Sequence, residues 1–115
     1  MAEVGNSNLL KLNTGILPKD ACIVMVKTEW NAAIVDELEA GCRRVFEENG
    51  IAAVSCITVP GAVEIPFAVK SYWDAHKYQD ERPHAFIALG CVIRGDTPHF
   101  EYVCQAVTEG VSKLN

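Results

Sequence analysis

The sequence lacks the motifs and charge clusters that mark several common classes of ligand-binding protein. Neither the glycine-rich pattern G-x-x-x-x-G-K-[ST] nor G-x-G-x-x-G occurs, which argues against the nucleotide-binding enzymes that depend on those loops. The longest run of Lys and Arg is Arg43-Arg44, and the formal net charge is −5. A chain with so little clustered positive charge is not expected to neutralise the phosphates of a nucleic acid.

Long apolar runs and a leader pattern are also missing. No stretch approaches the roughly 20 apolar residues that cross a bilayer. Residues 1–20 do not combine a basic start with an apolar stretch, so we expect no membrane association and a cytoplasmic protein. This segment is rich in Gly, Asn and Pro and is expected to be a tail. Its patch of Leu9, Leu10 and Leu12 could dock on a neighbouring subunit or stay loosely tethered.

Five cysteines are present, but none is arranged as C-x-x-C. They lie mostly inside apolar segments, which is typical of small core residues in a reducing compartment. We therefore expect neither a bound metal nor a disulfide framework. The five positions are Cys22, Cys42, Cys56, Cys91 and Cys104.

From residue 21 onward, apolar runs of strand type alternate with segments of helical periodicity. Such alternation predicts an α/β fold, a three-layer α-β-α sandwich whose parallel sheet has helices on both faces. We expect residues 21–115 to form one α/β domain. The predicted elements are strands over 21–26, 51–59 and 84–92, a helix from Ala32 to the stop at Asn49-Gly50, a helix after Pro60-Gly61 ending near Tyr78, and a helix from Pro98 to about Leu114.

In such a sheet the ligand crevice lies beyond the carboxyl ends of the strands, where three loops should meet: 28–31, 60–64 and 94–99. The last loop has the pattern of an anion site. Thr97 is a predicted N-cap and Pro98 suits the first helical position, which would place His99 in the first turn. Unpaired N–H groups at a helix start, with Gly95 allowing close backbone approach, favour a bound anion.

Each candidate side chain also has a purely structural interpretation. His99 could act as a proton-transfer residue or be a solvated residue of the first helical turn. Arg94 could supply positive charge near a phosphate or form an ordinary surface ion pair. Trp30 could be a rim aromatic or a stacking platform for a flat heterocycle, and Glu64 could be a helix-start carboxylate or an acceptor for substrate groups.

Three segments resemble one family. They are Glu29-Trp30-Asn31, then Val59-Pro60-Gly61-Ala62-Val63-Glu64-Ile65-Pro66, and the run from Leu89 to Val103 that contains Arg94-Gly95-Asp96-Thr97-Pro98-His99-Phe100. In order and spacing the chain resembles 6,7-dimethyl-8-ribityllumazine synthase, the penultimate enzyme of riboflavin biosynthesis, which has a flavodoxin-like sheet. The resemblance implies a transferase that condenses 5-amino-6-(D-ribitylamino)uracil with 3,4-dihydroxy-2-butanone 4-phosphate, without metal or cofactor.

The resemblance also implies a role for each matching residue. Trp30 would lie over the pyrimidine ring with Asn31 beside it. His99 would shuttle protons. The ribityl chain would be held by Gly61, Ala62, Val63 and Glu64, the ring edge by Cys91, Val92 and Ile93, and the phosphate by Arg94, Gly95, Asp96 and Thr97. Family members assemble as pentamers or as icosahedral shells of pentamers, so a homo-oligomer is expected.

Two departures from the family pattern modify these expectations. Trp30 stands where the family usually has Phe, which enlarges the platform and suggests the hypothesis that riboflavin itself binds. Family members also continue with a further strand and C-terminal helices, from which a neighbouring subunit contributes an aromatic residue and an arginine. The 115-residue chain is therefore expected to be a C-terminally shortened version, and an isolated copy is expected to be poorly folded or weakly active. The alternatives are a non-catalytic flavin- or lumazine-binding module and a shell-forming structural protein.

Overall fold

A computed structural model describes residues 20–115, so the predicted tail and its leucine patch lie outside the described residues. The elements alternate as the sequence predicts, and the sheet is parallel with strand order β2-β1-β3. Their bounds are β1 (Ile23–Thr28), α1 (Ala32–Glu48), β2 (Val54–Val59), the 3-10 turn η3 (Ala62–Glu64), α2 (Ile65–His76), β3 (Ala85–Leu89) and α3 (His99–Ser112).

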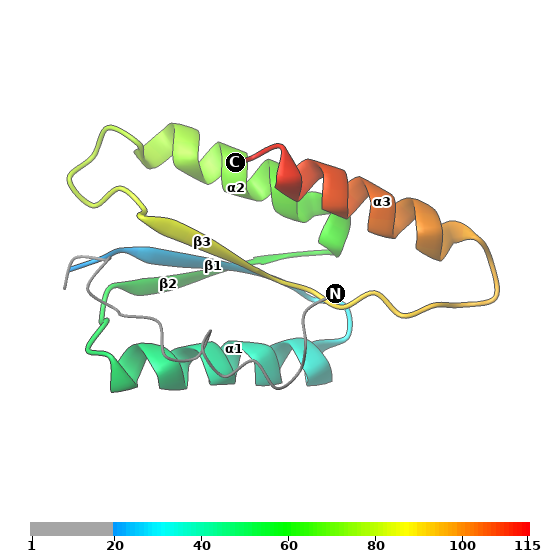
Figure 1. Ribbon diagram of the computed structural model, residues 1–115, viewed down its shortest axis with the longest axis horizontal. Helices are drawn as coiled ribbons and strands as arrows, with labels where there is room; N and C mark the ends of the chain where they lie inside the picture. Colours follow the sequence, from blue (N-terminus) through cyan, green and yellow to red (C-terminus); the bar gives the residue numbers. More distant parts are fainter. Residues whose placement is uncertain (1–19) are drawn as a thin grey trace.

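Helices cover both faces of the sheet. Figure 1 shows α1 below it and α2 and α3 side by side above it, the three-layer α/β arrangement of flavodoxin-like folds. Alternate residues of β1 point to opposite layers: Val24 and Val26 are buried toward α2, whereas Met25 is buried against Val35 of α1. Burial on both faces explains why β1 is a nearly continuous apolar run.

All five cysteines are free thiols and half-buried. Cys42, Cys56 and Cys91 surround the buried cluster of Met25, Val35 and Leu89. Burial raises the pKa of the Cys56 thiol, which keeps it protonated as a small apolar core residue.

Strand β1 begins and ends two residues later than predicted. At its start, Cys22 bonds to His84 instead: the Cys22 N–H donates to His84 Nδ1 at 3.0 Å, and the His84 N–H donates to the Cys22 carbonyl at 2.8 Å. At its end the strand includes Lys27, whose charge closed the apolar run in the sequence. Lys27 is tolerated there because its ammonium pairs with Asp36 at 3.1 Å and with Glu39 at 2.6 Å.

The ion pair between Lys27 and Glu39 shifts the pKa values of both side chains. The hydrogen bond to Glu39, and then that to Asp36, raises the pKa of Lys27 well above its usual range. Hydrogen bonds from Lys27 and then Arg43 lower the pKa of Glu39. Both groups are therefore charged at neutral pH, and they attach the carboxyl end of β1 to the second turn of α1.

The other predicted bounds are also wrong by a few residues. Strand β2 starts at Val54 because the Ile51 N–H donates to the Phe46 carbonyl at 2.9 Å and so belongs to the end of α1. That end is the predicted Asn49-Gly50 stop, with Gly50 at φ 71°. Strand β3 ends at Leu89, its last paired residue, and α2 ends at His76.

The start of α3 is shifted by one residue from the prediction. Pro98 is the N-cap and His99 the first helical residue, whereas the sequence indicated Thr97 and Pro98 for these positions. The Thr97 hydroxyl still serves the helix start, because it accepts a hydrogen bond from the His99 N–H at 3.4 Å. Pro66 lies in the first turn of α2, as predicted.

The close approach of α2 and α3 depends on a glycine. A Cβ on Gly110 of α3 would lie 2.5 Å from Cγ and 3.0 Å from Cβ of Pro66, which is too close for any side chain. A Cβ on Gly41 of α1 would meet only the end of the flexible Arg44 side chain, at 3.7 Å. Substitution by alanine is therefore expected to have opposite effects on stability at these two helical glycines.

Gly41→Ala should stabilise the chain by about 0.5–1 kcal/mol, the usual gain when alanine replaces glycine inside a helix. Gly110→Ala should instead destabilise it by about 1–3 kcal/mol, because the clash with the rigid Pro66 ring exceeds that gain. Urea unfolding of the two variants and the parent chain checks both signs. Equal stabilisation by both substitutions would contradict this packing of α2 on α3.

Candidate functional site

Most of the predicted ligand-binding residues meet at the carboxyl ends of the three strands, where they line a hollow of about 490 Å³. This volume lies within the range of small-molecule sites. The lining of the hollow includes ten of the residues singled out in the sequence: Trp30, Asn31, Gly61, Ala62, Val63, Glu64, Cys91, Val92, Ile93 and His99.

The predicted phosphate loop forms a separate, adjoining hollow. It is lined by Arg94, Gly95, Asp96, Thr97 and Pro98 together with three residues of α3, namely Glu101, Tyr102 and Gln105. His99 follows this loop directly in the chain and lines the first hollow. Of the two hollows, His99 therefore lines the one that holds Trp30 and Glu64, and it is not part of the lining of the phosphate-loop hollow.

Asn31 connects two of the three loops. It is the N-cap of α1 and has a left-handed backbone, φ 59° and ψ 44°, a conformation that asparagine tolerates better than most residues. Its carbonyl accepts hydrogen bonds from the N–H groups of Ile34 and Val35, both at 3.0 Å. Its side-chain Nδ2 donates to the Cys91 carbonyl at 2.9 Å, which fixes the segment that follows β3.

Trp30 precedes Asn31 and is 71% exposed. Its Cδ1 lies 3.8 Å from the point where a Cβ on Gly61 would be, so one edge of the indole rests over the loop after β2. Most of the ring is open to solvent inside the hollow. This placement is compatible with a flat heterocycle stacking on the indole.

Glu64 has the helix-start role that was one of its two interpretations. Its Oε2 accepts a hydrogen bond from the Gly61 N–H at 2.9 Å, and its own N–H donates to the Gly61 carbonyl at 3.1 Å, so the two bonds close the turn around η3. The contact holds the Pro60–Glu64 loop in shape. The other oxygen, Oε1, is the atom that could accept a hydrogen bond from a ligand hydroxyl.

Arg94 forms the surface ion pair that was the structural alternative to phosphate binding. Its guanidinium pairs with Glu101 of α3 and lies 4.5 Å from the centroid of the Phe100 ring. Asp96 adds a second carboxylate to the same hollow. An anion at this loop would therefore depend mainly on backbone N–H groups, because the positive charge of Arg94 is offset by Glu101.

Sequence reasoning missed several residues at this edge. Val103 lines the first hollow one helical turn after His99, and that spacing could have identified it. Thr28 was predicted only as part of the 28–31 loop, and the burial of its hydroxyl could not be predicted because its partner is a backbone carbonyl. Lys27 was missed because its partners lie nine and twelve residues further along.

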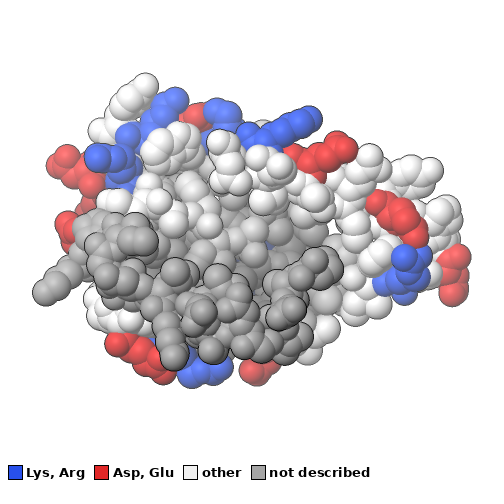
Figure 2. Space-filling view, viewed as in Figure 1, with Lys and Arg blue, Asp and Glu red and all other residues white. Residues whose placement is uncertain are grey.

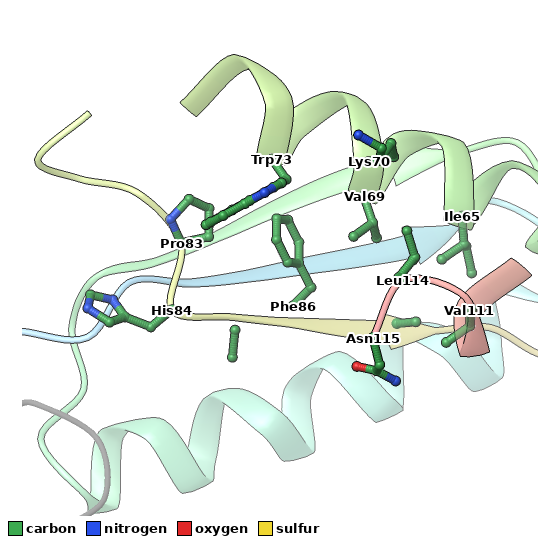
Figure 3. A pocket seen from close by; sticks show the side chains of 12 residues that line it. Ile65, Val69, Lys70, Trp73, Pro83, His84, Phe86, Val111, Leu114 and Asn115 are labelled. Atoms are coloured by element: carbon green, nitrogen blue, oxygen red, sulfur yellow. The ribbon is translucent and has the colours of Figure 1, made fainter. Parts of the chain in front are cut away.

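A different hollow lies beside β3, between α2 and the end of α3 (Figure 3). Most of its lining is apolar, including Val69, Trp73 and Phe86. Its lysine, Lys70, is already paired with Asp74 at 2.7 Å, and this pair lowers the pKa of Asp74. The polar groups that could orient a ligand converge instead at the carboxyl edge of the sheet.

The described residues offer little for a metal or a polyanion. Within residues 20–115 no group of three or more His, Cys, Asp and Glu side chains is arranged to hold a metal ion. On the face shown in Figure 2, basic and acidic side chains are interspersed. Each helix in this part of the chain is too short or too polar to cross a membrane.

Comparison with known proteins decides the family. The model of the 6,7-dimethyl-8-ribityllumazine synthase family matches residues 20–115. The chain belongs to the lumazine synthase family. Curated lumazine synthases are 39% identical over 97 residues in Mycolicibacterium gilvum, 40% over 99 residues in Porphyromonas gingivalis, and 42% over 90 residues in Mycobacterium leprae.

These matches cover 84%, 84% and 78% of the chain, but only 57%, 58% and 52% of the three relatives. The chain therefore spans little more than half the length of the curated lumazine synthases that it matches. The matched part includes β1, β2, β3 and the loops that carry both hollows.

The hydrogen bond from Asn31 to Cys91 can be tested by an isosteric change. Asn31→Asp keeps a residue that tolerates the left-handed backbone, but it turns an acceptor toward the Cys91 carbonyl and should cost about 1–3 kcal/mol of unfolding free energy. Asn31→Gly keeps the backbone without that repulsion and should lose less. Urea unfolding at pH 7 measures both, and an Asn31→Asp variant as stable as the parent would contradict the contact.

Proposed function

We propose that the chain carries the substrate site of a lumazine synthase. In this reaction 5-amino-6-(D-ribitylamino)uracil condenses with 3,4-dihydroxy-2-butanone 4-phosphate to give 6,7-dimethyl-8-ribityllumazine, phosphate and water. An imine forms with loss of water, phosphate leaves, and the ring closes with loss of a second water. The observation that carries the proposal is the single hollow in which Trp30, the Gly61–Glu64 loop, the Cys91–Ile93 segment and His99 come together.

The proposed pyrimidine position follows from the shape of that hollow. The ring stacks on the exposed face of Trp30, with Asn31 beside it, and its edge meets backbone groups of Cys91, Val92 and Ile93. The ribityl chain runs along Gly61, Ala62 and Val63 toward Oε1 of Glu64. The lining combines apolar side chains such as Val63 and Val103 with the polar side chains of Asn31 and Glu64, a mixture suited to a flat polar heterocycle.

The proposed phosphate position is the adjoining hollow. N–H groups of Gly95, Asp96 and Thr97 face the anion near the N-terminus of α3, and Arg94 contributes once it leaves Glu101. His99, at the first residue of α3, then lies between the phosphate and the pyrimidine. From there it shuttles protons while the imine forms and the ring closes.

The proposal extends to assembly and location. Large apolar side chains beside the site are exposed in the single chain: Phe67 is 77% exposed, Tyr102 69% and Ile93 61%. Side chains of this kind favour contact with further copies of the chain. We therefore propose a homo-oligomer, either a pentamer or an icosahedral assembly of pentamers. We also propose that this assembly is located in the cytoplasm.

His99→Ala separates an enzyme from a binding module. If His99 transfers protons, the variant should lose about 10²-fold or more in kcat while its affinity for the lumazine product stays within a few fold. His76→Ala, a histidine on α2 that stacks on Tyr72, is the matched control and should keep the parent rate. An unchanged rate in His99→Ala would show that this residue is not catalytic.

The indole of Trp30 predicts flavin binding, because its face is larger than that of the phenylalanine usual in the family. In a Trp73→Phe background, which leaves Trp30 as the one tryptophan, micromolar riboflavin should quench the remaining fluorescence. Trp30→Phe in the parent background reports any signal from Trp73 and should show little quenching. No quenching of Trp30 at micromolar flavin would rule out this hypothesis.

A further inference from the structure

Thr28, the last residue of β1, is the one buried polar side chain among residues 20–115, with 2% of its surface exposed. A buried hydroxyl is unfavourable unless it is hydrogen-bonded. Thr28 meets this requirement locally, because its Oγ1 donates to the Trp30 carbonyl at 3.2 Å. The hydroxyl thus closes a short turn between the end of the sheet and the aromatic residue of the hollow.

The position of Thr28 itself is fixed from several sides. Its backbone pairs with Val59 of β2, and the following N–H, of Glu29, donates to the Val59 carbonyl at 2.9 Å. Its methyl group lies beneath Gly90, where an added Cβ would be 3.6 Å away. The backbone that carries the Thr28 hydroxyl is therefore held in place by the sheet.

The indole of Trp30 has no comparable support of its own. The side chain is 71% exposed and approaches the Gly61 loop by one edge only. Its direction therefore depends on the backbone that carries it. That backbone is held on one side by the Thr28 hydroxyl and on the other by the left-handed Asn31.

We infer that Thr28 is a positioning residue, which acts through the Trp30 backbone to aim the indole over the hollow. This inference rests on the proposed function, in which the indole stacks on a flat heterocycle. Thr28 touches no substrate. Its hydroxyl reduces the number of indole orientations before the ligand arrives, and this lowers the entropic cost of binding.

The test uses the full chain in a Trp73→Phe background, so that fluorescence reports Trp30. Thr28→Val removes the hydroxyl and keeps the shape, whereas Thr28→Ser keeps the hydroxyl. Thr58→Val is the matched control, the same substitution at the exposed neighbouring position on β2. The measurements are the anisotropy of Trp30 without ligand, the Kd of 6,7-dimethyl-8-ribityllumazine and the Kd of inorganic phosphate.

Thr28→Val should lower the Trp30 anisotropy and weaken lumazine binding roughly fivefold, with the Kd of phosphate unchanged. Thr28→Ser and Thr58→Val should resemble the parent.

An unchanged anisotropy and lumazine Kd in Thr28→Val would overturn the inference, and so would equal weakening of the binding of both ligands. If the parent binds no lumazine, the proposed function fails, and the ligand-free anisotropy alone decides the role of Thr28. Should Thr28→Val not fold, Thr28→Ala makes the same comparison with Thr28→Ser.

Discussion

Strand β1 is hydrogen-bonded along both edges, to β2 on one side and to β3 on the other, and the position of every site residue depends on this arrangement. Because both neighbours are parallel to β1, the three carboxyl ends lie at one edge of the sheet. Each end then leads into a loop. The Asn31 amide connects the loop after β1 to the segment after β3, and the Thr28 hydroxyl closes the turn between β1 and Trp30.

The order and type of the elements could be predicted from the sequence because each apolar pattern reports burial directly. The continuous apolar run of β1 is buried on both faces, and the periodic apolar positions of α1 include the buried Val35. Loop residues such as Trp30 and Glu64 could be placed at one edge because parallel strands need crossover helices. Their meeting in one hollow follows from topology and not from their spacing in the sequence.

The exact strand bounds and the pairing of Arg94 could not be predicted, because they depend on contacts between side chains and backbone groups of different elements. Lys27 lies inside β1 only because Asp36 and Glu39 of α1 neutralise it. Strand β3 ends at Leu89, and after this end the Asn31 side chain donates a hydrogen bond to the Cys91 carbonyl. The pairing of Arg94 with Glu101 was one of two open alternatives, and residue types alone could not decide between them. No sequence pattern singles out Thr28 within the loop of residues 28–31, because its proposed role depends on a hydroxyl that only the fold buries.

We propose that one edge of this sheet holds both ligands of a lumazine synthase. The most direct test is an amide NMR map of the isotopically labelled chain, titrated separately with 6,7-dimethyl-8-ribityllumazine and with inorganic phosphate. Lumazine should shift the signals of Trp30, the 61–64 loop and residues 91–93, and phosphate should shift those of residues 95–97. Shifts centred instead on the apolar hollow of Figure 3, around Val69 and Phe86, would contradict it.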